Sequence, residues 1–550
     1  MDIIEKYFYF LSNRPKVALT FLVVLSGFYY LGLGHVHLFD WDEINFAESA
    51  REMIMSGNFT KVQINYFPFW EKPPLFFWLQ VLSMKVFGIN EFAARFPNAI
   101  FGSIYLVTLY WIGKKHFTSS FGLLWALVYF GAILPHMYFK SGIIDPVFNY
   151  FIFMSVYFLL MVLEDNKNSN KFAILSGIFS ALSVLTKGPV GFLLLALCFV
   201  IFIVIKRFKY FPPLRSFLLF LLGFLLIVGS WVGVELYQNG TENLLKFIDY
   251  QIELFSTSVA GHEQPFYYHF VVVFLGCFPL SIFALPTLLQ RTDGNKPNFQ
   301  LWMQILFWVV IILFSISTTK IVHYSSMTYI PLSFLAALYL YRMVEKKESW
   351  KNYILFLYLL VGLLWGILLV IVPILLSNAS LLFPYIQDDF AIDSLKTFVG
   401  WSGYESLIGF FFITTLLWTW WKIKNKKYIS SICFSSMGIG ITLLLTTYFI
   451  LPKIEGFTQG PVITFYQSIS HEDAYIDSYG YKSYAQYFYA NQKPGNNKKL
   501  PDREYLLNGP IDKPVYFVTK STNKELDNHP NFKLLKKEGG FRFYKREIGD

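Results

Sequence analysis

A series of long apolar runs constrains the fold of this chain more than any other feature. A helix of about 20 apolar residues crosses the hydrocarbon core of a bilayer. About thirteen runs approach that length, and they cover 14–34, 93–113, 118–136, 142–163, 171–186, 188–206, 215–237, 267–289, 299–316, 322–341, 352–377, 401–421 and 429–451. Backbone groups inside a bilayer must bond to one another, so such runs form helices. The sequence therefore predicts a membrane all-α fold with about 13 transmembrane helices.

The composition agrees with a membrane protein. Hydrophobic residues make up 55% of the chain and charged residues only 15%, whereas a soluble protein carries roughly 25% charged residues. The net charge of +10 is also found in nucleic-acid-binding proteins. We expect no nucleic acid here, because the Lys and Arg residues gather in alternate loops between the apolar runs.

These basic residues also predict the orientation. With the N-terminus in the cytoplasm, the cytoplasmic loops hold about twice as many Lys and Arg residues as the outer loops. This arrangement places the C-terminal tail outside. The first apolar run lacks a small-residue cleavage site, so we expect it to be retained as a helix. The sequence predicts a multi-pass protein of the inner (plasma) membrane.

Some common sites are missing from the sequence. Cys198, Cys277 and Cys433 all lie inside apolar runs, which predicts small buried side chains and neither a disulfide framework nor a zinc site. The chain has no Gly-rich phosphate loop and no dinucleotide-binding fingerprint. We therefore expect no site for a soluble nucleotide sugar or ATP.

Three outer segments are long, namely 35–92, 238–266 and the tail from Pro452. In the tail, strands are predicted at 474–476, 515–518 and 541–544, with a turn at 539–540 and a helix within 481–491. The sequence thus predicts a transmembrane domain over 1–451, whose outer loops 35–92 and 238–266 carry the functional site. A small extracytoplasmic α/β domain is predicted over 452–550.

The first outer loop opens with three acids, Asp40, Asp42 and Glu43, where the first helix leaves the bilayer. An acidic cap beside Trp41 is the plainer interpretation. A carboxylate at a membrane edge is also a candidate base, because desolvation raises its pKa towards a useful value. Residues 43–55 then follow the pattern of an amphipathic helix lying along the membrane surface.

The same loop continues with Glu71-Lys72-Pro73-Pro74. The two prolines forbid a helix at this point and stiffen the backbone. A lysine held on such a segment is suited to bind a phosphate group. The alternative is a lysine whose stem lies along the interface while its charge reaches water.

Other polar residues are predicted on the same side of the membrane. Charged groups at membrane depth are costly and tend to mark functional sites. Each of these residues alone would be an ordinary helix-end residue, and only their shared side favours a site. They are Asp145, Lys187, His262, Tyr267, Lys320, His323 and Tyr324.

Taken in order, these motifs resemble the GT-C glycosyltransferases that use lipid-linked sugars. The chain is most similar to the bacterial branch that contains the aminoarabinose transferases of lipid A and relatives of the protein O-mannosyltransferases. The resemblance extends over roughly residues 10–345. The matching motifs are Asp42-Glu43, Ala47-Glu48-x-x-Arg51-Glu52-Met53, Glu71-Lys72-Pro73-Pro74-Leu75, Trp78-Leu79-Gln80, Phe87-Gly88-x-Asn90-Glu91-Phe92-Ala93-Ala94-Arg95-Phe96-Pro97, Asp145-Pro146, Thr186-Lys187-Gly188-Pro189, His262 with Pro265-Phe266-Tyr267-Tyr268, and Ser317 to Tyr324.

The resemblance implies a polyprenyl-phosphate sugar as donor and a glycolipid, glycan or protein as acceptor. Asp42 would be the catalytic base, the transfer would proceed with inversion, and Lys72 with Lys187 would stabilise the departing phosphate. The remaining implied substrate-binding residues are Glu43, Arg51, Glu71, Asp145, His262, Tyr267, Lys320 and Tyr324.

No cofactor is required by this chemistry, and we expect a monomer. Glu71 and His262 are candidate ligands for a divalent metal, since Glu and His are common metal ligands. Asn45 and Phe46 stand where the aminoarabinose transferases often have a basic residue and Tyr. These two departures leave the sugar and the acceptor open.

Two other function classes fit a chain with many membrane spans. A transporter or lipid flippase would usually show broken helices in corresponding positions of two halves. The sequence has no such symmetry, and its polar residues gather on one side rather than at the midplane. A non-catalytic lipid-binding or assembly protein is the third class, and retention of Asp42 favours an enzyme over it.

Overall fold

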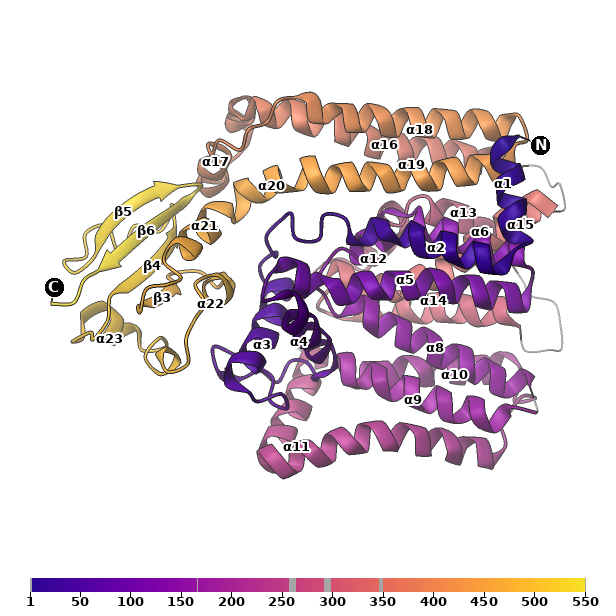
Figure 1. Ribbon diagram of the computed structural model, residues 1–550, viewed down its shortest axis with the longest axis horizontal. Helices are drawn as coiled ribbons and strands as arrows, with labels where there is room; N and C mark the ends of the chain where they lie inside the picture. The colour runs from indigo at the N-terminus through magenta and orange to yellow at the C-terminus, as the bar shows by residue number, and fades with distance from the viewer. Residues whose placement is uncertain (1, 166, 257–263, 291–297, 346–349, 550) are drawn as a thin grey trace.

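Most of the chain folds into long helices that lie side by side in one block, with a small sheet domain at one end (Figure 1). The computed structural model describes residues 2–165, 167–256, 264–290, 298–345 and 350–549. Within these residues, nine helices are long and apolar enough to cross a membrane, or up to 11 if each of two bent pairs is one span. The predicted all-α membrane fold is confirmed.

The helices of the block follow the predicted apolar runs. Their bounds are α1 Ile3–Ser12, α2 Pro15–Tyr30, α5 Glu91–His116, α6 Ser119–Phe130, α7 Ile133–Tyr138, α8 Asp145–Glu164, α9 Ser169–Lys187, α10 Val190–Ile205, α11 Leu214–Ser256, α12 Tyr268–Gly276, α13 Leu280–Leu288, α14 Phe299–Ile316, α15 Tyr329–Glu345, α16 Asn352–Ser377, α18 Leu407–Lys424 and α19 Tyr428–Phe449. Helices α6 and α10 have only 12 and 16 residues. The number of about thirteen spans therefore stays a prediction.

Prolines lie where two helix pairs bend. Helices α12 and α13 meet at 117°, and Pro279 immediately precedes α13. Helices α1 and α2 meet at 114°, and Pro15 is the first residue of α2. Proline has no N–H to continue a helix and its ring clashes with the preceding turn, so a helix ends before it more easily than it runs through it.

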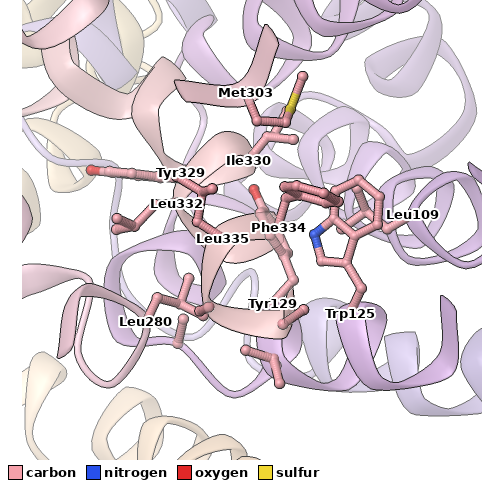
Figure 2. Packing of buried hydrophobic residues seen from close by; sticks show 14 of the residues in the cluster. Leu109, Trp125, Tyr129, Leu280, Met303, Tyr329, Ile330, Leu332, Phe334 and Leu335 are labelled. Atoms are coloured by element: carbon pink, nitrogen blue, oxygen red, sulfur yellow. The ribbon is translucent and has the colours of Figure 1, made fainter. Parts of the chain in front are cut away.

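Packing at the centre of the block fixes the segment that precedes α15. Figure 2 shows Trp125 of α6 against Phe334 of α15, with ring centroids 5.2 Å apart. The indole N–H of Trp125 also donates to the hydroxyl of Ser333 at 2.8 Å. These side chains are fully buried, so α15 and the 3-10 turn η1 (Val322–Thr328) before it are held in one position.

The first outer loop is folded rather than irregular. It contains α3 Asp42–Ser56, the short paired strands β1 Gln63–Ile64 and β2 Phe67–Pro68, and α4 Leu75–Phe87. The predicted helix over 43–55 is present, but its polar side does not face water as a surface-lying helix would. Arg51 is 1% exposed and Glu52 is 0% exposed, because the C-terminal domain covers that side of α3 (Figure 1).

The second outer loop, predicted over 238–266, is largely helical. Helix α11 continues to Ser256, with one non-helical residue at Gly240, where φ is 74°. Glycine adopts this left-handed backbone without steric cost, which allows the helix to change direction there. No long apolar run marks residues 241–256, so the prediction treated them as loop. Residues 257–263 lie outside the described part of the chain.

The C-terminal domain is built on a four-stranded sheet of order β3-β4-β6-β5. Strands β3 and β4 are parallel and the other pairs are antiparallel. The three predicted strands, the hairpin turn at 539–540 and a short helix near 485 are present. The prediction missed β5, because its Lys-rich sequence is almost entirely exposed. The bounds are β3 Tyr475–Ser478, α22 Ala485–Tyr489, η4 Asn496–Lys498, α23 Arg503–Asn508, β4 Val515–Lys520, β5 Lys533–Glu538 and β6 Phe541–Arg546.

Short helices lie between the sheet domain and the block, in the segment between α16 and α18 and in the segment after α19. They are η2 Ala379–Tyr385, α17 Asp389–Leu395, η3 Tyr404–Ser406, α20 Leu451–Thr458 and α21 Gly460–Ser468. Gln459, between α20 and α21, accepts a hydrogen bond from the N–H of Asp40 at 3.0 Å and donates one to the carbonyl of Leu38 at 2.8 Å. Tyr489 of the sheet domain accepts from the N–H of Leu38 at 2.7 Å. The beginning of the first outer loop is thus held by the last part of the chain.

Candidate active site

The three acids at the start of the first outer loop have three different environments. Asp40 accepts hydrogen bonds from the hydroxyl of Ser483 and from the N–H of Tyr484, the latter at 3.0 Å. Trp41 follows with φ at 75°, a left-handed backbone that is costly for a bulky residue. This strained residue separates Asp40, which binds the C-terminal domain, from the helix that begins at Asp42.

Glu43 is fully engaged with protein groups. Its carboxylate oxygens lie 3.0 and 2.8 Å from the guanidinium of Arg95, and it also accepts from the N–H groups of Phe39 at 2.9 Å and Gly142. Burial alone would raise the pKa of Glu43, but Arg95 and these N–H groups lower it below its ordinary value. Glu43 is therefore an ionised buried partner of Arg95. This set of contacts favours a structural role over the expected substrate contact.

Asp42 is the acid that faces open space. Its side chain is 34% exposed, and its Oδ2 lies 3.2 Å from Nε2 of His323. His323 comes from η1, which the central packing holds in place, and its own side chain is only 14% exposed. A carboxylate oriented by one imidazole and open on its other side can accept a proton from a bound molecule.

Lys72 and Glu71 form a close pair in the proline-stiffened segment before α4. The ammonium of Lys72 lies 2.6 Å from the Glu71 carboxylate, and the lysine side chain is 12% exposed. Burial opposes the charge on Lys72, but Glu71, followed by Tyr324 and Asp42, outweighs it and raises the pKa of Lys72 above its ordinary value. Lys72 is thus a fixed positive charge within electrostatic range of Asp42.

The last turns of α11 hold this segment. Gln251 donates to the carbonyl of Glu71 at 3.0 Å, and the indole N–H of Trp70 donates to Asn243 at 3.0 Å. A cleft between the two segments has Lys72 and Phe247 among its lining residues. The part of α11 that was predicted as loop therefore positions the lysine.

A second ion pair, between Asp145 and Lys187, contacts η1. The Lys187 ammonium is 2.6 Å from Asp145 and 5.1 Å from the centre of the Tyr324 ring. Asp145 begins α8, and Lys187 ends α9 at the predicted turn. Ser326 of η1 also donates to Asp145, at 3.4 Å.

These contacts bring most of the predicted residues together around η1. His323 lies within electrostatic range of both acids and both lysines, namely Asp145, Asp42, Lys187 and Lys72. Tyr324 has Lys72, Glu71, Asp42 and Asp145 as charged neighbours. With Glu71, the result is three acids and two lysines from four segments of the chain, arranged around one histidine and one tyrosine.

Arg51 is not part of this cluster. It makes a bidentate pair with Glu48, at 2.7 and 2.6 Å, and donates to Asn491 at 3.1 Å and to the carbonyl of Gln492 at 2.9 Å. These contacts dock the C-terminal domain on α3. They favour a structural role for Arg51 over substrate binding.

The other predicted residues have less connection to the cluster. Tyr267 precedes α12 and is 62% exposed. Lys320 is 7% exposed and donates to the carbonyl of Ser317 at 2.6 Å. His262 lies outside the described residues, so its predicted role is neither supported nor opposed.

Comparison with known proteins points to one superfamily. The family described as dolichyl-phosphate-mannose-protein mannosyltransferase matches residues 71–232. The chain is 27% identical, over 349 residues, to the undecaprenyl phosphate-alpha-4-amino-4-deoxy-L-arabinose arabinosyl transferase 1 of Proteus mirabilis, and the match covers 62% of each chain. The corresponding transferase of Aeromonas hydrophila is 22% identical over 447 residues, 78% of this chain and 76% of that enzyme.

The fold comparison covers nearly the whole chain. The crystal structure of ArnT from Cupriavidus metallidurans bound to undecaprenyl phosphate superimposes with a TM-score of 0.76 and 17% identity, over 96% of this chain and 97% of that chain. The chain has the fold of this ArnT and is similar in sequence to the aminoarabinose transferases. Its sheet domain belongs to the shared fold, because the superposition extends over both parts of the molecule.

Sequence reasoning missed several residues beside this site. His323 was expected only as one of the outer polar residues, yet it is the partner of Asp42. Tyr250 of α11 has Glu71 and Lys72 as charged neighbours, and Tyr484 of the sheet domain has Glu71, Asp40 and Asp42. Sequence offered a signal only for His323, which stands in the matching motif next to Tyr324.

The described part of the chain contains no group of three or more His, Cys, Asp or Glu side chains that could hold a metal. Glu71 is engaged by Lys72, and its predicted co-ligand His262 is outside the described residues. The metal pair remains a prediction.

Proposed function

We propose that this chain is an integral-membrane glycosyltransferase that moves a sugar from a polyprenyl-phosphate donor to an acceptor on the extracytoplasmic face. The observation that carries the proposal is the open carboxylate of Asp42, held by His323 at 3.2 Å and within electrostatic range of the buried cation Lys72. A base and a fixed cation at one site are what sugar transfer from a phosphate ester needs. The names of the relatives support undecaprenyl phosphate as the lipid carrier.

In the proposed reaction, Asp42 takes the proton of an acceptor hydroxyl while that oxygen attacks the anomeric carbon of the sugar. The bond from this carbon to the phosphate oxygen breaks, and the polyprenyl phosphate leaves with the electron pair. Attack opposite the leaving group inverts the anomeric centre. A phosphate acceptor would be already ionised and would need no proton transfer.

The lysines would act on the leaving group. Charge builds on the phosphate as the sugar departs, and preformed cations stabilise it without rearranging at that moment. Lys72 is the principal candidate because it is buried and positively charged. Lys187 is the second candidate. It lies over the Tyr324 ring, beside the same cluster of charged residues. Tyr324 and Asp145 would position the sugar.

The proposal also covers cofactor use, oligomeric state and orientation in the membrane. The reaction as written requires no cofactor, and Glu71 with His262 is the proposed pair should a divalent metal take part. We infer a monomer with a cytoplasmic N-terminus. The proposed outer face is the end of the helical block where α3, α4 and the sheet domain lie (Figure 1).

The test is sugar transfer by the purified protein in nanodiscs. Synthetic polyprenyl-phosphate sugars, including aminoarabinose, are incubated with lipid A or other acceptors, and both the glycosylated acceptor and the free polyprenyl phosphate are measured by mass spectrometry. The proposal expects equal amounts of the two products. Movement of the intact donor between the leaflets of sealed proteoliposomes, with neither product formed, would support a flippase instead.

A further inference from the structure

The sheet domain reaches into the site through the segment 482–484, at the start of α22. The hydroxyl of Ser483 and the N–H of Tyr484 both donate to Asp40, two residues before the proposed base. Helix α22 lies beside α3 (Figure 1). The segment is therefore fixed to the same short piece of chain that carries Asp42.

Two aromatic rings continue this contact. Trp41 and Tyr484 pack edge to face, with ring centroids 5.8 Å apart. The Lys482 ammonium lies 5.1 Å from the Trp41 ring centre and 5.4 Å from the Tyr484 ring centre. The two rings restrict the lysine and attract its charge without neutralising it.

Lys482 differs from the other cations of the site. Lys72 and Lys187 each lie 2.6 Å from a carboxylate, whereas no carboxylate of the described chain lies within ion-pair distance of Lys482. Lys482 is also exposed. An accessible, unneutralised cation held over Trp41, the residue before the proposed base, is arranged to receive an anion from outside the protein.

We propose that Lys482, held by Trp41 and Tyr484, binds an anionic group, such as a phosphate, on the acceptor and so orients the acceptor hydroxyl towards Asp42. The inference rests on the proposed function and extends it to the acceptor, which no other described feature selects. The donor phosphate is assigned to the buried lysines Lys72 and Lys187. Lys482 would thus make the sheet domain a determinant of acceptor specificity.

The test measures binding, so it does not depend on turnover. Protein in nanodiscs is titrated with lipid A, with lipid A after enzymatic removal of its phosphates, and with undecaprenyl phosphate. Lys482→Ala should weaken binding of phosphorylated lipid A about tenfold, the effect of losing one charge-assisted hydrogen bond. Lys482→Glu should weaken it further and Lys482→Arg should restore most of it. Undecaprenyl phosphate and dephosphorylated lipid A should bind all these proteins as they bind the wild type.

Lys499→Ala is the matched control. Lys499 is an exposed lysine of the same domain that lies 4.2 Å from the centre of the Tyr505 ring, and it should change none of these affinities. Equal binding of phosphorylated lipid A to Lys482→Ala and the wild type would overturn the inference. So would a loss that is the same with and without the phosphates, or a loss of undecaprenyl phosphate instead. Absence of sugar transfer in the wild type would count against the proposed function and leave these binding results to be judged separately.

Discussion

At the scale of single residues, the site separates acids that look alike in sequence. Asp40 binds the sheet domain, Glu43 binds Arg95, and Asp42 remains open beside His323. The three acids differ in the groups that each carboxylate contacts. This difference leads to different expectations for substitutions that remove the charge of Asp42 or of Glu43.

Asp42→Asn keeps the size of the side chain but cannot accept a proton. We expect this variant to insert, to bind the polyprenyl-phosphate donor as the wild type does, and to transfer sugar about 10² to 10⁴ times more slowly, the usual effect of losing a general base. Turnover and donor binding are measured on the same purified sample. Turnover above about a tenth of the wild-type rate, far more than such a loss allows, would show that Asp42 is not the base.

Glu43→Gln serves as the contrast. It leaves the buried Arg95 guanidinium without its charged partner, and breaking such a pair costs about 3–5 kcal/mol. The expected result is a lower melting temperature and a lower yield of folded protein, with near-normal turnover per folded molecule. A stable but inactive Glu43→Gln would instead return Glu43 to the substrate-binding role expected from its sequence motif.

Lys72→Ala should weaken binding of undecaprenyl phosphate, because a charge-assisted contact is worth about 1.5–3 kcal/mol. Lys72→Arg should recover part of the affinity and of the turnover. Lys246→Ala is the control, since Lys246 lies over Trp70 in the same region but pairs with the exposed Glu242. If Lys72→Ala binds the lipid as well as the control does, Lys72 only holds its own loop at the interface.

At the scale of elements, α3 carries a buried group of two acids and one arginine. Arg51 neutralises Glu48, while Glu52 accepts a hydrogen bond from the N–H of Tyr66 at 2.8 Å. Burial, and then the neighbouring Glu48 carboxylate, raise the pKa of Glu52 well above its ordinary value. The folded protein therefore holds this proton more tightly than the unfolded chain does.

The raised pKa of Glu52 predicts how the free energy of unfolding depends on pH. Because the folded-state pKa of Glu52 is raised, the free energy of unfolding should fall as pH rises from the ordinary pKa of Glu, near 4.3, through the higher folded value. Glu52→Gln should remove that part of the pH dependence and stabilise the protein at neutral pH. Thermal unfolding of both proteins across this pH range gives the measurement. Parallel curves for the two proteins would contradict the assignment.

The same elements show what the sequence could predict. The apolar runs predicted the helices because hydrophobic length is a local property, and the motif of Asp42 and Lys72 is contained in one loop. Arg51 was expected at the substrate because a sequence does not tell a buried ion pair from a ligand-facing charge. Lys482 and Tyr484 could not be placed, since their position beside Trp41 depends on how the sheet domain docks.

Helix α11 illustrates a second limit. Its last turns are amphipathic and short, and no apolar run distinguishes them from a polar loop. These turns contact the Glu71–Lys72 segment, for example through Gln251. Structure that depends on a distant partner is not visible in a local pattern.

At the scale of the whole molecule, the orientation in the membrane is the main prediction. Lys424 and Asn508 are both exposed, so a cysteine at either position should react with a thiol reagent that can reach it. In intact cells and a cysteine-free background, Asn508→Cys should react with a membrane-impermeant reagent and Lys424→Cys should not. Both should react after the membrane is permeabilised. The reverse pattern in intact cells would invert the proposed topology.

The hydrogen bond between Ser483 and Asp40 joins residues 443 positions apart. The first outer loop therefore emerges from the ribosome long before the segment that fixes it. Until residues 482–484 have been made and docked, Asp40 lacks these partners and Lys482 is not beside Trp41. A chain still being synthesised would hold Asp42 and Lys72 without the sheet-domain side of the site, so competence for transfer would arise only after residues 482–484 have been made and docked.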